Sequence, residues 1–318
     1  MTPKIMTQGL VDVVTYDTGV SGKTLAIFGA VHGNEPCGTI AINQLIEILD
    51  RGTIKLETGK LILVPVAHKE AYQAKLRHLG DNLNRYFFPV EQPQKAVDYL
   101  HNALCAILDE CHGFLDIHSY HNTAAKSGDS LVFATGPKKE DVYYRSLGVD
   151  VLVTGWTEAN GDEVEQDWRQ PSTGSVQYAR RNQHGCIAAT MECGEHDDPH
   201  SVIVAEAAIQ RAISFFGLVH QNNPFFIADY RQDPLIYKMQ PNSTLFKVDA
   251  LEKAQPSPHL RNFTHIEVGD DLLVDEISGR PLVKATESGY VLFPHFNAAT
   301  GDELLSICQR KKVKLLQQ

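Results

Sequence analysis

The sequence predicts an α/β protein with a mostly parallel, mixed sheet flanked by helices, followed by a smaller β-rich C-terminal domain. From about residue 23 to 217, short apolar runs alternate with segments whose apolar residues recur every three or four positions. Strands that alternate with helices are typical of a sheet covered on both faces. After "QNNPFF", short alternating runs broken by Gly, Pro, Asn and Asp replace this pattern. We therefore predict two domains, residues 1–222 and 223–318.

The elements of the first domain follow from apolar runs of strand length and from helical spacing. The expected strands are residues 24–28, 60–66, 113–119, 130–135, 150–155 and 186–192. The expected helices are residues 36–52, 94–113 and 200–219. In the second domain, the alternating runs predict strands at residues 244–248, 270–276, 281–285 and 289–293.

Composition narrows the class of protein. The 318 residues are 43% hydrophobic and 21% charged, which is typical of a globular enzyme. A net charge of −10 argues against nucleic-acid partners and against docking on anionic membranes. The start, "MTPKIMTQGL", lacks the apolar core of a signal peptide, and no run approaches the length of a membrane span. Six scattered cysteines without a CxxC pair are expected to be reduced thiols in the cytoplasm. The sequence also allows a homo-oligomer.

The first strand, in "KTLAIFGAVHGNE", ends in a polar cluster that contains His32, Asn34 and Glu35. In an open α/β sheet, ligands bind where strands end and loops lead into helices. The alternative is an ordinary helix start, with Asn34 as the N-cap and Pro36 in the first turn. Alone, the H-x-x-E pattern favours this capping interpretation.

A second strand, "FLDIHSY", ends at His118, with Asp116 on the same face. Together, His32, Glu35 and His118 form a His₂Glu set that leaves a fourth position open, as catalytic zinc requires. Asp116 is placed to orient a ligand imidazole. A single histidine here would more simply be a half-buried structural residue. Other candidates nearby are His112 and His121.

Two further stretches contain residues suited to catalysis or to substrate binding. The strand "CIAATME" ends at Glu192, which suits a general base, with Glu195 and His196 as weaker candidates. The alternative is a solvated glutamate at a strand end. The stretch "KLRHLGDNLNRYF" offers three residues that suit capture of a carboxylate, unless it is an ordinary surface loop. They are Arg77, Asn84 and Arg85.

The motifs "HGNE", "DNLNR", "DIHS" and "MECG", in this order, resemble the aspartoacylase and succinylglutamate desuccinylase family, a branch of the zinc-carboxypeptidase-like hydrolases. The resemblance covers roughly residues 23 to 195. It implies a zinc-carboxypeptidase-like fold whose catalytic domain is residues 1–222. It also implies one Zn²⁺ per chain, held by His32, Glu35 and His118.

The resemblance further implies roles around the zinc. Glu192 would be the general base or acid, and Arg77 would polarise the scissile carbonyl. Asn84 and Arg85 would bind the substrate carboxylate, and Tyr178 would contact the substrate.

The chain also departs from the family pattern. Ten residues before the catalytic glutamate, aspartoacylases have an arginine where this chain has Asn182, with Arg180 and Arg181 just upstream. We take Arg181 as a candidate for substrate binding, whereas which of Arg180, Arg181 and Asn182 faces the substrate stays open. A C-terminal tyrosine that binds the aspartate side chain in the family has no clear match around "FPHFNAATGDE". A preference for anionic substrates is therefore expected, whereas the acyl group and the amino acid stay open.

We predict a zinc amidohydrolase that acts on an N-acyl amino acid or a similar small carboxylate-bearing amide, with zinc-activated water and Glu192 as base. The alternatives are a zinc carboxypeptidase acting on peptide C-termini and a non-catalytic zinc- or ligand-binding relative. The β-rich part, with loops such as "ESGYVLFPHF", is expected to form a wall over the mouth of the site.

Overall fold

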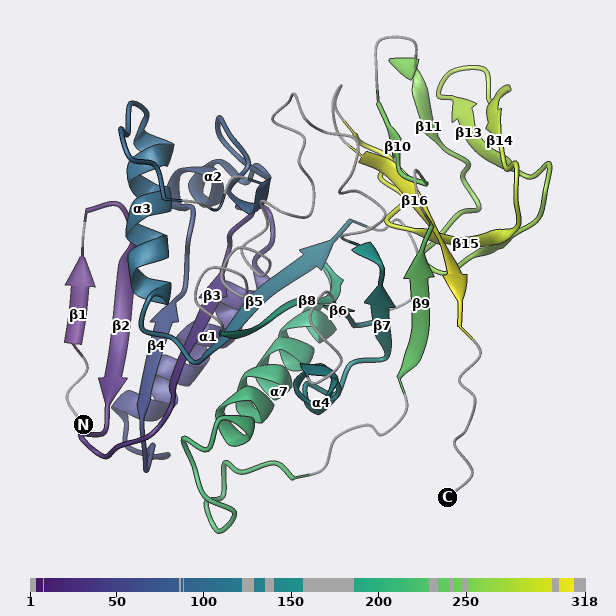
Figure 1. The fold of residues 1–318 in the computed structure, drawn as a ribbon. Coiled ribbons are helices and arrows are strands. Elements are labelled where there is room, and N and C mark those ends of the chain that lie inside the picture. The colour runs from purple at the N-terminus through teal and green to yellow at the C-terminus, as the bar shows by residue number, and fades with distance from the viewer. Residues whose placement is uncertain are drawn as a thin grey trace, which may run out of the picture.

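The computed structural model has an α/β architecture built on one large sheet (Figure 1). It describes residues 4–7, 9–85, 87, 89–121, 129–134, 140–156, 186–228, 234–240, 243–247, 251–298 and 303–311. The strands of the first part are β1 (Lys4–Thr7), β2 (Asp12–Asp17), β3 (Thr24–Gly29), β4 (Lys60–Val64), β5 (Gly113–Tyr120), β6 (Leu131–Ala134), β7 (Val151–Thr154) and β8 (Ile187–Glu195). The helices are α1 (Cys37–Asp50), α2 (Lys69–Ala74), the 3₁₀ turn η1 (Leu83–Arg85), α3 (Ala96–Leu108), α4 (Asp141–Ser146) and α7 (Pro199–Phe215).

The later strands are short, and two of them join the main sheet to the β-rich part. They are β9 (Leu235–Met239), β10 (Leu245–Phe246), β11 (Ala254–Pro256), β12 (His265–Ile266), β13 (Asp271–Asp275), β14 (Pro281–Lys284), β15 (Gly289–Leu292) and β16 (Glu303–Arg310). Among the described residues, the main sheet has the order β1-β2-β4-β3-β5-β8-β6-β7-β9-β16-β15-β12, with β10 beside β16. Strands β11, β13 and β14 form a separate small sheet.

The main sheet is mixed, as predicted, but it has more antiparallel pairs than the alternation of strands and helices suggested. Its centre, β4-β3-β5-β8, is parallel. At one end β2 runs antiparallel to β4, and beyond the centre β6 runs antiparallel to β8. The direction of β6 depends on which neighbour it meets in space, and a local apolar pattern carries no such information.

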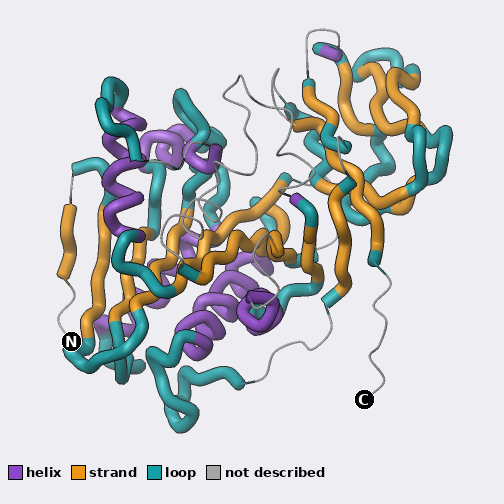
Figure 2. Tube along the Cα trace, in the orientation of Figure 1, coloured by secondary structure: helices purple, strands orange, loops and turns teal. Residues whose placement is uncertain are grey.

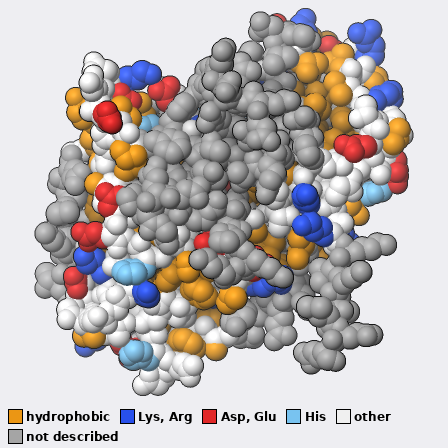
Figure 3. Space-filling view, in the orientation of Figure 1, with side chains coloured by type: hydrophobic (Ala, Val, Ile, Leu, Met, Phe, Trp, Pro, Cys, Tyr) orange, Lys and Arg blue, Asp and Glu red, His pale blue; other side chains and the backbone are white. Residues whose placement is uncertain are grey.

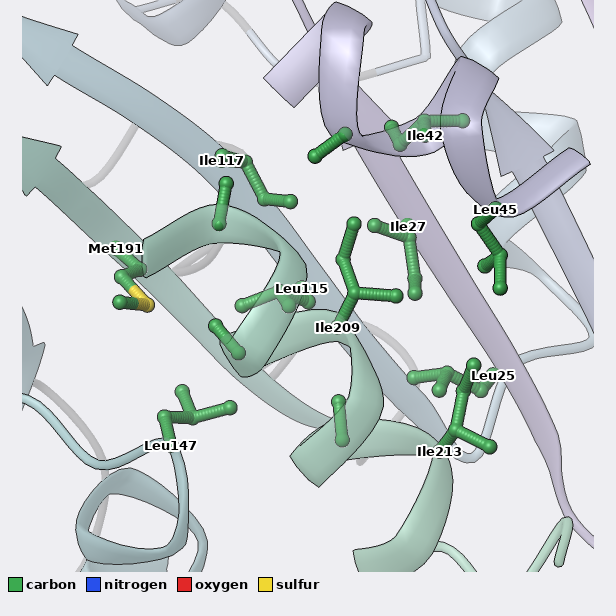
Figure 4. Close-up of a cluster of buried hydrophobic side chains, with 14 of the residues drawn as sticks. Leu25, Ile27, Ile42, Leu45, Leu115, Ile117, Leu147, Met191, Ile209 and Ile213 are labelled. Carbon is green, nitrogen blue, oxygen red and sulfur yellow. The ribbon is translucent and has the colours of Figure 1, made fainter. Parts of the chain in front are cut away.

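Both faces of the central strands are buried, which explains their continuous apolar runs. Leu25 and Ile27 of β3 point into a core covered by α1 and α7 (Figure 4). The alternate residues, Ala26 and Phe28, belong to a second core beneath α3. Successive side chains of a strand point to opposite faces, so the same strand contributes to both cores. The polar residues after these strands are therefore the first that reach the edge of the sheet.

The β-rich part is joined to the first part by strand pairing. β9 runs parallel to β7, and β16 runs antiparallel to β9, so the strands continue across the molecule (Figure 2). A common core spans the junction, with Phe133 and Trp156 on one side and Tyr237 and Leu292 on the other. β9 and β16 were not predicted from the sequence, nor were β1, β2, β11, β12, α2 or α4. The division at residue 222 stays a prediction.

Surface and thiol chemistry agree with a globular protein. Acidic and basic side chains are interspersed on the described part of the face seen in Figure 3. Among the described helices, none combines the length and the apolar character that crossing a bilayer requires. All six cysteines are buried and free.

Removal of a core side chain should be costly. Leu115 is buried in β5 between α1 and α7, so Leu115→Ala is expected to lower the free energy of unfolding by about 2–5 kcal/mol. Ile203 is 58% exposed on α7, and Ile203→Ala is the control, with a change of about 0.5 kcal/mol or less. Denaturant titration measures both. Equal losses in the two variants would contradict this description of the core.

Candidate functional site

Three side chains of metal-binding type meet at one edge of the sheet. β3 and β5 are parallel neighbours, with Gly29 opposite Ile117, so their C-terminal ends lie together. His118 is in β5, whereas His32 and Glu35 are in the turn between β3 and α1. The exposed fraction of each of the three residues is only 1–2%.

The Glu35 carboxylate joins the two imidazoles. Its Oε1 lies 2.8 Å from Nδ1 of His32, and its Oε2 lies 2.7 Å from Nδ1 of His118. The two Nδ1 atoms are 3.1 Å apart. Because all three ligand atoms lie within 4.8 Å of one another, this group could hold one metal ion.

The charges around this cluster favour a cation. His118 lies between two buried carboxylates, because its Nε2 is 2.8 Å from Oδ2 of Asp116. Burial alone would lower the pKa of His118, but Asp116 and Glu35 outweigh it and raise that pKa well above its usual range. Burial lowers the pKa of His32 to about 3, with help from Arg77, so its imidazole is neutral and able to coordinate. A divalent cation would balance the two carboxylates.

The outer nitrogens of both imidazoles have partners that orient the rings. Asp116 contacts His118, as the sequence suggested, and Oδ1 of Asn82 lies 3.1 Å from Nε2 of His32. Asn82 was missed at the level of sequence, although it belongs to the motif "DNLNR". The backbone N–H of Ser119 donates to Oε2 of Glu35 at 3.2 Å. Such contacts fix ligand orientation and basicity.

The capping interpretation of the first motif is wrong for Asn34. Helix α1 begins at Cys37 with Pro36 as its N-cap, and no side chain caps it. Instead, Nδ2 of Asn34 lies 3.3 Å from Nε2 of His121. The Glu35 carboxylate points at the histidine pair rather than at the end of the helix.

Glu192 lies directly across from His118. β5 and β8 are parallel, and these two residues are register partners, so their side chains share one face. Glu192 is half-buried, and its Oε2 has no hydrogen-bond partner among the described residues. Burial, followed by the nearby Glu35 carboxylate, raises the pKa of Glu192 to about 8. A carboxyl group with this pKa can take up and release a proton near neutral pH.

The two arginines lie against carboxylates. Nη1 of Arg77 donates to Oε1 of Glu35 at 3.0 Å, and the Arg77 side chain is 38% exposed. Nη2 of Arg85 donates to Oε1 of Glu303 at 3.1 Å, and its Nη1 donates to the backbone oxygen of Asn84 at 2.9 Å. No local sequence pattern indicated that Glu303, at the start of β16, would reach Arg85.

The other residues considered from the sequence lie at different distances from the His32–Glu35–His118 cluster. His112 lies before β5, at the opposite end of the strand from His118, where its Nδ1 accepts from the backbone N–H of Thr24. His121 and His196 form an edge-to-face pair beyond the strand ends, and Glu195 pairs with Tyr120 in register. Tyr178, Arg180, Arg181 and Asn182 lie outside the described residues.

The fold and this cluster define an α/β protein with a buried site able to hold a metal. The chain belongs to the succinylglutamate desuccinylase/aspartoacylase family, since the model of that family's catalytic domain matches residues 21–210. The succinylglutamate desuccinylase of Vibrio campbellii is 23% identical over 97% of this chain and 87% of its own length. These relatives support a hydrolase that acts on amides.

Solved structures share the fold. A succinylglutamate desuccinylase/aspartoacylase from Rhodobacter sphaeroides superposes with a TM-score of 0.70 at 16% identity, over 95% of this chain and 90% of that one. The product-bound ectoine utilization protein EutE (DoeB) from Ruegeria pomeroyi gives 0.69 at 18% identity, over 94% and 88%. At sequence identities of 16% and 18%, the similarity to these structures shows a shared fold and nothing more.

The glycine between the first two ligand residues should be essential. A Cβ on Gly33 would lie 2.1 Å from the backbone carbon of Ala71 and 2.3 Å from the nitrogen of Tyr72, in α2. Gly33→Ala must therefore shift either the backbone of α2 or the turn that carries His32 and Glu35. We expect the turn to shift and metal affinity to fall at least about tenfold. Titration of the apo-protein with Zn²⁺ measures the effect.

Gly52→Ala is the matched control. Gly52 has a φ of +68° at the end of α1 and nothing within 4 Å of an added Cβ, so the change introduces backbone strain in open space. It should cost about 1–2 kcal/mol of stability and leave metal affinity intact. Unchanged affinity in Gly33→Ala would show that the turn tolerates the crowding.

Proposed function

We propose that this protein is a zinc-dependent deacylase that cleaves the amide bond of an N-acyl amino acid or a similar small carboxylate-bearing amide. The observation that carries the proposal is the buried His32–Glu35–His118 cluster with Glu192 opposite His118. Membership of the desuccinylase and aspartoacylase family supports it. We also infer a fold related to the zinc carboxypeptidases, and a cytoplasmic location consistent with six buried, free cysteines.

The donor set fits zinc, one ion per chain. Two imidazole nitrogens and one carboxylate are preferred zinc ligands, and three protein ligands leave a position open for water or substrate. When bound, the metal supplies a Lewis acid and lowers the pKa of water to about 7. Hydrogen bonding of the outer imidazole nitrogens to Asn82 and Asp116 would keep both Nδ1 atoms directed at the ion.

Glu192 is proposed to move the proton. As a carboxylate it accepts a proton from the attacking water, and as a carboxylic acid it donates that proton to the leaving amine. Its raised pKa suits both steps. Arg77 is proposed to stabilise the oxyanion, since its guanidinium lies beside the cluster and remains partly exposed.

Substrate binding is assigned to Asn84 and Arg85, whose backbone and side chain are joined by a hydrogen bond in η1. Tyr178 and Arg181 are proposed as further contacts. The β-rich part is proposed to close the mouth of the site: His295 stacks on His121 with ring centroids 5.2 Å apart, and Glu303 pairs with Arg85. Such a wall favours single acylated amino acids over long peptides.

Metal content tests the ligand set. Purified protein should contain about one equivalent of zinc, and His118→Ala should lose it because one of three ligands is gone. His200→Ala, an exposed histidine of α7, is the control and should retain the metal. Full zinc in His118→Ala would rule out this set. The readout is elemental analysis after dialysis.

Replacement of the base should separate metal binding from turnover. Glu192→Gln is nearly isosteric but cannot accept the proton, so kcat should fall about 10²- to 10⁴-fold while zinc is retained. The exposed Glu276→Gln should leave kcat unchanged. Near-normal turnover in Glu192→Gln would transfer the base role to another residue, with Glu195 and His196 next to be tested.

A substrate panel tests the function itself. The panel contains N-acetyl, N-succinyl and N-formyl amino acids, together with unblocked peptides of several residues, and release of free amine is measured. Hydrolysis of at least one acylated amino acid without trimming of the peptides is expected. Efficient release of C-terminal residues would favour a carboxypeptidase, and no hydrolysis of any compound by the zinc-loaded protein would favour a binding protein.

A further inference from the structure

Glu303, a carboxylate from the β-rich part, contacts Arg85. Together with Asn84, Arg85 forms the proposed binding site for the substrate carboxylate, called the substrate clamp below. Glu303 and Arg85 are 218 positions apart in sequence, yet their side chains meet at 3.1 Å. Their side chains are 24% and 14% exposed, so water screens the pair less than it would at the surface.

Strand pairing fixes where Glu303 lies. It is the first residue of β16 and the register partner of Phe246 in β10. The next residue, Leu304, accepts a hydrogen bond from the backbone N–H of His295 at 2.8 Å. His295 in turn stacks on His121, which follows the end of β5 near His118. Strand pairing therefore fixes the backbone that carries Glu303 beside the site, and Arg85 contacts its carboxylate.

Glu303 neutralises the charge of the substrate clamp but does not use all the N–H donors of Arg85. A guanidinium has five N–H donors, and the bonds to Glu303 and to the backbone of Asn84 use two of them. Donors therefore remain for one substrate carboxylate. The positive charge of Arg85, however, is already balanced, and the Glu303 carboxylate retains the capacity to accept further hydrogen bonds.

We propose that Glu303 is a specificity-determining residue: by pairing with Arg85, it favours N-acyl amino acids whose side chain carries an amino group over those whose side chain carries a second carboxylate. The inference rests on the proposed deacylase function and deepens it. A second substrate carboxylate would face the like charge of Glu303, whereas an ammonium group would find an acceptor there.

The test compares three substrates of similar size: Nα-acetylornithine, Nα-acetylglutamine and Nα-acetylglutamate. The zinc-loaded wild-type protein should show the highest kcat/KM with the ornithine derivative. In Glu303→Gln, the ratio of kcat/KM for the ornithine derivative to that for the glutamate derivative should fall at least about tenfold, and the neutral glutamine derivative measures the part of the change that is common to all three substrates. Glu267→Gln, an exposed acid of the same part, is the control and should keep the wild-type ratio.

The outcomes are distinct. If Glu303 merely positions Arg85, or is displaced by every substrate carboxylate, Glu303→Gln will change all three substrates alike, and the proposal fails while the deacylase function stands. If the wild-type protein hydrolyses none of them, the proposed function fails for this substrate class. Calorimetric binding of free ornithine and free glutamate to the two proteins then decides on Glu303: a preference for ornithine that is lost in Glu303→Gln supports it, and equal affinities contradict it.

Discussion

The buried carboxylate of Glu35 is the group on which the rest of the site depends. It contacts Nδ1 of both histidines and Nη1 of Arg77, and it is almost completely shielded from water. An ionised carboxylate at this depth costs several kcal/mol unless it is paired. A second buried carboxylate, Asp116, lies on the far side of His118. The Arg77 guanidinium pairs with Glu35, and the two carboxylates raise the pKa of His118 well above its usual range, so this excess of negative charge suits a bound cation.

Strand register also brings Glu192 and the Glu303–Arg85 pair to the end of the sheet where Glu35 lies. β3, β5 and β8 are parallel neighbours, so the residues that follow one strand end lie beside those that follow the next. Glu192 thereby faces His118 without any long-range signal in the sequence. The continuous sheet, through β9 and β16, then brings Glu303 against Arg85. The residues to which we assign metal binding, proton transfer and substrate selection are thus brought together by the strands of one sheet.

The positions of most site residues could be predicted from the sequence, because polar residues stand out where they end an apolar strand. His32, Glu35 and His118 were predicted on this basis and come together in the structure, and Glu192 was predicted to lie near them. Contacts between distant segments left no local trace: Glu303 is a single charged residue at the start of a strand whose next five residues are buried. The direction of β6 and the joining of β9 to β7 were missed for the same reason, since strand partners are chosen in space.

X-ray absorption at the zinc edge of the metal-loaded protein tests the central claim most directly. Two buried thiols lie near the site residues in sequence: Cys37 is two positions after Glu35, and Cys193 follows Glu192. The Sγ of Cys37 is 3.5 Å from the backbone oxygen of His118. The account predicts nitrogen and oxygen neighbours at about 2.0–2.2 Å, with the scattering of two imidazole rings and no sulfur. A sulfur shell at about 2.3 Å, or fewer than two imidazoles, would contradict a site built on His32, Glu35 and His118.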